Sequence, residues 1–132
     1  MKEYVRLPET EFEIMQAVWD EPSPVSSMQI ASVVGPVKGW KPQTILTMLT
    51  RLTNKGVLSS EKRGKERYYT PLITREEYLT GETGYFMERF HKNSLVGLIS
   101  ALYSNANPNE KDLNELEQWL QDAAAKGGNH ND

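Results

Sequence analysis

The sequence contains no cysteine and only two histidines among its 132 residues. The absence of cysteine excludes disulfides, zinc fingers and thiolate metal sites, and two histidines alone do not make a metal or catalytic centre. His91 and His130 have no partners at the spacing of a general base, so an enzyme is the least favoured class and no cofactor is expected. Long hydrophobic runs are also missing, so neither a membrane span nor a signal peptide is expected. These absences favour a soluble, cytoplasmic protein.

The net charge of −3 conceals an uneven distribution of charge along the chain. Residues 1–75 hold 11 Lys and Arg against 8 Asp and Glu, whereas residues 76–132 hold 4 against 10. The segment Lys38–Arg75 holds nine basic residues, opposed only by Glu61 and Glu66. A basic half beside an acidic half is typical of a protein that binds phosphate with one part and protein with the other. A randomly uneven surface is the alternative.

Apolar spacing and capping signals predict three short helices in the basic half. They cover residues 7–20, 26–34 and 41–55. The second helix has a Ser-x-x-Gln capping box at its start and should end before Gly35-Pro36. The third helix has Pro42 in its first turn, and Gly56 is a candidate C-terminal cap.

The third helix carries the clearest functional signal. Its apolar residues repeat at i, i+3, i+4 and i+7, so the remaining residues must face outward: Gln43, Thr44, Thr47, Thr50, Arg51, Asn54 and Lys55. This outward set contains no carboxylate, whereas an ordinary solvated face mixes Glu with Lys. Its residue types suit contacts with base edges and phosphates. The sequence therefore predicts a DNA recognition helix with contacts from Lys41, Gln43, Thr44, Thr47, Arg51 and Lys55.

A β-hairpin is predicted directly after this helix. Two β-capable runs, residues 57–61 and 66–70, flank a turn that contains glycine and basic residues. A basic hairpin is weak evidence alone, but three helices followed by a hairpin is the order of a winged helix-turn-helix. Residues 1–73 are therefore predicted to form a DNA-binding domain, with phosphate contacts in the wing from Lys62, Arg63, Lys65 and Arg67.

The acidic half is predicted to form further helices. Their large apolar side chains exceed what about 50 residues can bury alone, which favours burial against a second copy. Burial on the N-terminal half is the alternative. The fold class is mainly α with a small β-hairpin wing, a helical dimerisation region at 74–125 and a disordered tail at 126–132. The expected dimer contacts are Tyr85, Phe86, Leu98, Leu102, Leu113, Leu116, Trp119 and Leu120.

Three segments together resemble a known family. They are residues 11–15, 69–71 and the long run 40–56, which fits Trp-x-Pro-x-Thr-[Ile/Val]-x-Thr-x-Leu-x-Arg-Leu-x-x-Lys-Gly. From about Leu7 to Leu120 the chain resembles the penicillinase-repressor family of BlaI, MecI and CopY type. The resemblance implies a homodimeric winged-helix repressor that binds an inverted repeat in double-stranded DNA and is released by an inducing signal. Thr44, Thr47 and Arg51 match the family's DNA-facing positions.

The chain also departs from that family pattern. Gln43 stands where a basic residue is frequent, Lys41 where serine is usual, and Pro8 replaces the usual cap of the first helix. In the β-lactam-responsive members a regulatory protease cuts an Asn-Phe bond, and the aligned pair here, Ala101-Leu102, is the candidate cleavage position. The cysteine motifs of the copper-responsive members are missing, so copper sensing of that kind is not expected.

Two alternatives keep the winged helix but change its use. In the first, the protein is a ligand-sensing regulator with a small-molecule pocket between the domains, near Tyr78, Tyr85, Phe86 and Trp119. In the second, the winged helix contacts only protein, which predicts no salt-dependent affinity for DNA. The carboxylate-free face of the third helix argues against this second alternative.

Overall fold

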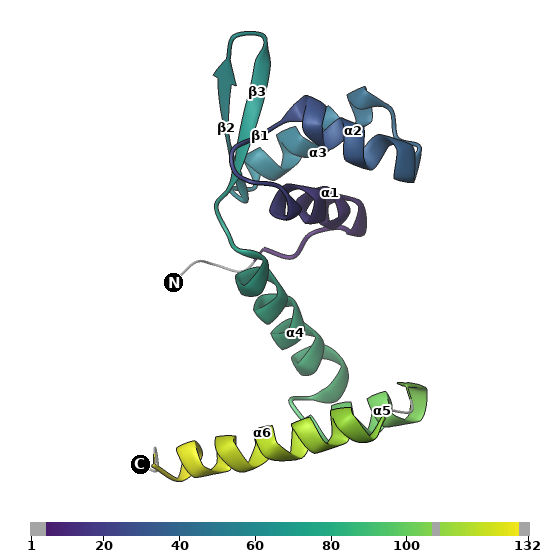
Figure 1. Ribbon diagram of the computed structural model, residues 1–132, viewed down its shortest axis with the longest axis vertical. Coiled ribbons are helices and arrows are strands. Elements are labelled where there is room, and N and C mark those ends of the chain that lie inside the picture. The colour runs from purple at the N-terminus through teal and green to yellow at the C-terminus, as the bar shows by residue number, and fades with distance from the viewer. Residues whose placement is uncertain (1–4, 107–108, 130–132) are drawn as a thin grey trace. The chain divides into compact units, whose positions relative to one another are not determined.

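The computed structural model describes residues 5–106 and 109–129 and shows six helices with a small antiparallel sheet (Figure 1). Two compact units divide between Tyr85 and Phe86. The mainly α fold with a β-hairpin confirms the predicted fold class. The elements are α1 (Glu9–Asp20), β1 (Val25–Ser26), α2 (Ser27–Lys38), α3 (Pro42–Asn54), β2 (Leu58–Arg63), β3 (Glu66–Pro71), α4 (Arg75–His91), α5 (Leu95–Ala106) and α6 (Glu110–Asn129).

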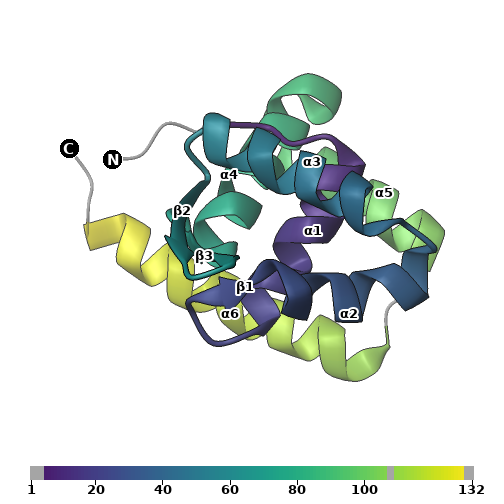
Figure 2. The ribbon, with the colours of Figure 1, turned by 90° about the horizontal axis from the view of Figure 1, so that it is seen from above.

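The first unit has a hydrophobic core that lies between three helices and the sheet. Helices α1, α2 and α3 contact one another in pairs, and the sheet packs beside them (Figure 2). The core takes its fully buried side chains from every one of these elements. They include Ile14, Met15 and Val18 of α1, Ile30 of α2, Ile45, Leu49 and Leu52 of α3, and Val25 and Leu58 of the sheet.

Helix α2 begins as predicted but ends later. The Ser26 hydroxyl accepts a hydrogen bond from the Gln29 backbone N–H at 3.1 Å, and the Gln29 side chain accepts from the Ser26 N–H at 2.8 Å. The predicted end before Gly35-Pro36 is wrong, because the helix continues through Pro36 to Lys38. The residue before a proline normally clashes in a helix through its Cβ atom, which Gly35 lacks.

Helix α3 confirms the predicted pattern of buried and exposed residues. Its four apolar stripe positions, Ile45, Met48, Leu49 and Leu52, are all buried. Pro42 occupies the first helical position. Gly56 follows the helix with φ of +79°, a conformation that costs glycine little, so the chain turns there directly into the sheet.

The sheet has three strands in the order β1-β3-β2. Strands β2 and β3 form the predicted hairpin, with Arg63 opposite Glu66 across a two-residue loop. Gly64 is the first loop residue and has φ of +64°, the sign that a type II′ turn requires there. Strand β1 was not predicted, because two residues are too short to show an alternating pattern.

The boundaries toward the C-terminus differ from the sequence prediction. Helix α4 starts at a capping box of Thr74 and Glu77, and its Tyr78 is buried in the core of the first unit, so this unit extends past the predicted boundary at residue 73. Helix α6 reaches Asn129, so residues 126–129 are helical where a disordered tail was predicted. Residues 130–132, which include His130, lie outside the described residues. No helix in the described ranges is long and apolar enough to cross a membrane.

Candidate nucleic-acid interface

The outward face of α3 consists of exposed polar side chains without a carboxylate. All seven residues assigned to this face from the sequence are exposed, and Lys41 is exposed at the N-cap of the helix. The nearest acidic residues along the chain are Glu21 and Glu61. Arg51 makes no ion pair with any described residue, so its guanidinium is available to a ligand outside the fold.

Three threonines of α3 use their hydroxyl hydrogens inside the helix. Thr47 donates to the carbonyl of Gln43 at 3.0 Å, and Thr50 and Thr53 donate to the carbonyls four residues before them at 3.0 and 2.8 Å. The hydroxyls therefore cannot also donate to a phosphate, although their methyl groups and lone pairs remain available. A methyl group at Thr47 suits contact with the C5-methyl group of thymine.

The wing, formed by β2 and β3, has two chemically different faces. Directly paired residues of an antiparallel hairpin lie on the same face, and successive residues alternate. Ser60 pairs with Tyr69 and Lys62 with Arg67, on the face that also carries the buried Leu58. The opposite face carries Glu61, Arg63, Glu66 and Tyr68. Both carboxylates of the wing therefore lie on the side away from Arg67.

The four predicted basic residues of the wing are all exposed, but two are already engaged. The Arg63 Nε lies 2.8 Å from Glu61 Oε1, and its guanidinium lies 5.1 Å from the centre of the Tyr68 ring. The Arg67 Nη1 donates to Ser60 Oγ at 3.1 Å. Lys62 and Lys65 are exposed and make no ion pair within the described chain.

Lys55 differs from the other predicted contacts because its ammonium group binds within the fold. It forms an ion pair with Glu11 of α1, whose side chain is almost completely buried. This pair was not predicted from the sequence, although Glu11 precedes the buried Ile14, Met15 and Val18 at i+3, i+4 and i+7. A carboxylate at a core-facing position needs a cation, and this requirement was the available signal.

A polar hollow lies where α3 meets the wing. Its volume is about 230 Å³, and it is called the α3–wing hollow below. It contains no carboxylate, and it brings Arg67 together with residues that were not predicted as contacts. Its lining consists of Thr50, Thr53 and Asn54 of α3 with Ser60, Arg67 and Tyr69 of the wing. The two-residue alternation of the hairpin around Gly64 was the signal that could have placed Ser60 and Tyr69 beside Arg67.

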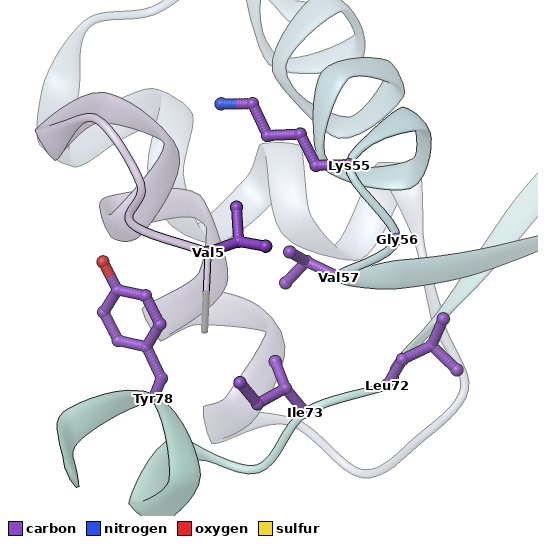
Figure 3. Close-up of a pocket in the computed structure, with 7 residues that line it drawn as sticks. All are labelled: Val5, Lys55, Gly56, Val57, Leu72, Ile73 and Tyr78. Atoms are coloured by element: carbon purple, nitrogen blue, oxygen red, sulfur yellow. The ribbon is translucent and has the colours of Figure 1, made fainter. Parts of the chain in front are cut away.

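A larger pocket of about 430 Å³ lies in the first unit (Figure 3). Apolar side chains supply most of its lining: Val5, Val57, Leu72, Ile73 and Tyr78, together with Lys55 and Gly56. Of the residues predicted for a ligand pocket, only Tyr78 is found here. Lys55 is engaged by Glu11, and the Tyr78 hydroxyl accepts a hydrogen bond from the Leu7 N–H at 3.1 Å.

The predicted dimer contacts fall into two groups. Tyr85 belongs to the first unit, where the Arg6 guanidinium lies 4.6 Å from its ring centre. The other seven, Phe86, Leu98, Leu102, Leu113, Leu116, Trp119 and Leu120, belong to the second unit. None of these seven is buried, and Trp119 is 61% exposed. The second unit, over its described residues, thus presents apolar side chains that its own helices do not cover.

The candidate cleavage position lies inside a regular helix. Ala101 and Leu102 fall in the middle of α5, and the Asn105 side chain donates to the Ala101 carbonyl at 2.8 Å. A protease binds its substrate in an extended form, so this bond becomes accessible only when α5 unwinds. No cluster of His, Cys, Asp and Glu that could hold a metal ion occurs among the residues that the structure describes.

Three helices, a wing and a carboxylate-free α3 define a winged-helix DNA-binding domain. The chain belongs to the penicillinase repressor family, whose pattern it matches over residues 7–122. It is 30% identical to the penicillinase repressor of Bacillus licheniformis over 92% of this chain and 94% of that protein. It is 24% identical to the methicillin resistance regulatory protein MecI of Staphylococcus aureus over 83% of this chain and 89% of that protein. The family consists of transcriptional repressors, so the protein is not an enzyme.

Two solved structures resemble the N-terminal part of the chain. The DNA-binding domain of the repressor BlaI gives a TM-score of 0.52 at 33% identity, covering 59% of this chain and 94% of that domain. The monomeric form of Bacillus licheniformis BlaI in complex with the blaP half-operator gives 0.50, with the same identity and coverage. These similarities confirm the prediction of a DNA-binding repressor with a winged helix.

Proposed function

We propose that the protein represses transcription as a homodimer that binds an inverted-repeat operator and leaves it on an inducing signal. The observation that carries this proposal is the carboxylate-free, exposed face of α3 beside a basic wing. In this arrangement α3 enters the major groove and the wing contacts the flanking backbone. Each copy reads one half of the operator, and the BlaI monomer bound to a half-operator supports this stoichiometry.

The residues divide into base contacts and phosphate contacts. The N-terminal half of α3 enters the groove first, so Gln43, Thr44 and Thr47 face base edges, with Lys41 beside them. Arg51 reads a base one turn further along the helix. Lys62, Arg63, Lys65 and Arg67 neutralise phosphates, which fixes the position of the protein on the duplex without selecting a sequence.

Exposed apolar residues in α5 and α6 support the homodimer. Leu113, Leu116 and Leu120 repeat along one side of α6, with Trp119 next to them. Apolar stripes of this kind are stable in water when a second surface covers them. A second copy of the same helices offers a self-complementary surface, as a two-fold symmetric dimer requires.

We also propose that the inducing signal acts on the second unit, because loss of the dimer removes one half of the operator contacts. A regulatory protease that cuts at Ala101-Leu102 is one route. Since the bond lies within α5, cutting requires local unwinding, and stabilising α5 should slow it. Release by a bound ligand is the other route, and the mass of the released protein distinguishes the two.

The test is fluorescence anisotropy on the upstream DNA of the gene and on a scrambled duplex at two salt concentrations, with mass measured alongside. Tight, salt-sensitive binding of a dimer to the upstream DNA alone is the expected result. Arg51→Ala should cost about 1–3 kcal/mol and relax base preference, whereas Lys65→Ala should weaken all DNA equally and lower the salt slope by about one. Equal or absent binding of the wild type to both duplexes would contradict the proposal.

A further inference from the structure

We propose that the α3–wing hollow is a seat for one phosphate group of the DNA backbone, held by Arg67, Ser60, Asn54 and Tyr69. This inference rests on the proposed function and assigns a ligand to a site between the recognition helix and the wing. The hollow lies where a winged helix passes from the groove to the flanking backbone, which places a backbone phosphate next to it.

The lining of the hollow has the chemistry that a phosphate site needs. A phosphate diester offers only acceptor oxygens and one negative charge, so its site needs donors, a cation and no carboxylate. Arg67 supplies the cation and donors, and Glu61 and Glu66 lie on the other face of the hairpin. Ser60 Oγ accepts from Arg67 Nη1, which orients the hydroxyl and leaves its hydrogen free to donate.

Tyr69 adds a hydroxyl donor to the lining of the hollow. Its side chain is only 2% exposed and lines the hollow, yet its hydroxyl has no hydrogen-bond partner among the described residues. The ring is buried, but the hydroxyl is not among the buried unpaired polar atoms of the described residues, so it reaches the surface of the hollow and can donate to a ligand there. Burial raises the pKa of Tyr69, against the opposing charge of Arg67, so the hydroxyl stays protonated and can donate at neutral pH.

Thr50 and Thr53 shape the hollow without binding the phosphate. Both donate their hydroxyl hydrogens to carbonyls of α3, so they cannot donate again. Asn54 has an exposed side-chain amide at the end of α3 and can supply the remaining donor. The phosphate is therefore held between one α3 residue and three wing residues, which fixes the wing relative to the groove.

The first experiment measures DNA affinity and its salt dependence by anisotropy for Arg67→Gln, Tyr69→Phe and the double variant. Arg67→Gln should weaken binding about tenfold and lower the salt slope by about one for each bound subunit. Tyr69→Phe keeps the buried ring and loses only the donor, so binding should weaken about threefold with an unchanged slope. In the double variant, Tyr69→Phe should add little to the loss caused by Arg67→Gln, because both act on one phosphate.

Arg63→Gln is the matched control. Arg63 is also a wing arginine, but it lies on the opposite face beside Glu61 and Tyr68. Tyr69→Phe should therefore keep its full effect in the Arg63→Gln background. Full additivity with Arg67→Gln, or no effect of Tyr69→Phe in the wild type, would overturn the seat. Urea unfolding of each variant separates these outcomes from a loss of the fold.

The second experiment identifies the source of the phosphate. Single methylphosphonates, which remove the charge of one phosphate, are placed along the operator defined by footprinting. One position per half-site should weaken the wild type and have no further effect on Arg67→Gln. In parallel, inorganic phosphate is titrated into the free protein and followed by NMR at the Arg67 Nε–H.

Binding of inorganic phosphate with no sensitive methylphosphonate position would overturn the DNA backbone as the source and leave a free-anion site. No response in either measurement would overturn the phosphate seat entirely. In both cases, wild-type protein that still binds its operator in a salt-dependent manner would leave the proposed function intact. Failure of the wild type to bind DNA would instead contradict the proposed function.

Discussion

The two units of the chain differ in how far they bury their apolar side chains. In the first unit Ile14, Leu49 and Leu52 are completely buried, and every element contributes to one core. In the second unit, over its described residues, none of the hydrophobic side chains is buried, and Val96 and Trp119 are 76% and 61% exposed. The first unit thus has the packing of an independently folding domain, whereas the second presents a surface to be covered.

This difference matches the two functions that we propose for the chain, DNA reading and self-association. A closed core holds α3 rigidly against the wing, which DNA reading requires because base contacts depend on exact placement. An open helical surface gains stability when a partner covers it, and under the proposed homodimer this stability depends on protein concentration. The charges follow the same division, since the basic residues gather in Lys38–Arg75 and the acidic ones beyond it.

Truncation of a core leucine should give the largest loss of stability. It tests whether the first unit is stable without a second copy of the chain. Leu49→Ala leaves a cavity in the centre of the core and should cost about 2–5 kcal/mol of unfolding free energy at every protein concentration. Leu102→Ala, which truncates a 54% exposed leucine of the second unit, is the matched control and should change monomer stability by less than about 0.5 kcal/mol. Urea unfolding measures both, and equal losses would break the comparison.

Truncating an apolar side chain of the second unit should instead weaken dimer formation. Trp119→Ala removes the largest exposed side chain of α6 and should raise the dimer dissociation constant about thirtyfold, roughly the 2 kcal/mol of an interface hot spot. Operator binding should weaken with it. Gln121→Ala changes an exposed polar residue of the same helix and should leave the dimer unchanged. Sedimentation over a range of concentrations decides, and an unaltered profile for Trp119→Ala would exclude this interface.

The sequence predicted those features that depend on neighbouring residues. The capping boxes at Ser26 and Thr74, the buried stripe of α3 and the turn at Gly64 are local signals, and the structure contains all of them. The long-range features were missed. Glu11 meets Lys55 across 44 positions, and strand β1 exists only because β3 lies beside it. The α3–wing hollow likewise combines residues of three elements, so no single periodic pattern could predict it.

Lys55 is the subject of the next prediction, because its ammonium group pairs with Glu11 of the first unit instead of being free on the surface. Lys55→Met leaves the buried Glu11 carboxylate without its cation and should cost about 1–3 kcal/mol of stability. The salt slope of DNA binding should stay unchanged, whereas loss of a phosphate contact would lower it by about one.

Glu11→Gln also tests whether Lys55 contacts phosphate, because the direction of the change in DNA affinity differs between the two cases. Removing a negative charge should strengthen DNA binding if Lys55 is thereby freed to contact phosphate. If the pair instead holds the end of α3 against α1, affinity should fall or stay constant, which is the outcome that we expect. The double variant Glu11→Gln/Lys55→Met should recover part of the stability lost in Lys55→Met.

The smallest expected effect is a loss of stability at alkaline pH, which should depend on a tyrosine of the first unit and not on one of the second. Burial raises the pKa of Tyr69 above its ordinary value of 10.0, so the unfolded chain loses this proton at a lower pH than the folded chain does. The contribution of Tyr69 to stability is therefore complete below about pH 10 and declines as the pH rises through the folded-state pKa. In urea unfolding at different pH values, Tyr69→Phe should remove this part of the loss of unfolding free energy at alkaline pH. Tyr103→Phe changes an exposed side chain of α5 and should leave the loss in place. If the two variants behave alike, Tyr69 is not the group that couples the core of the first unit to pH.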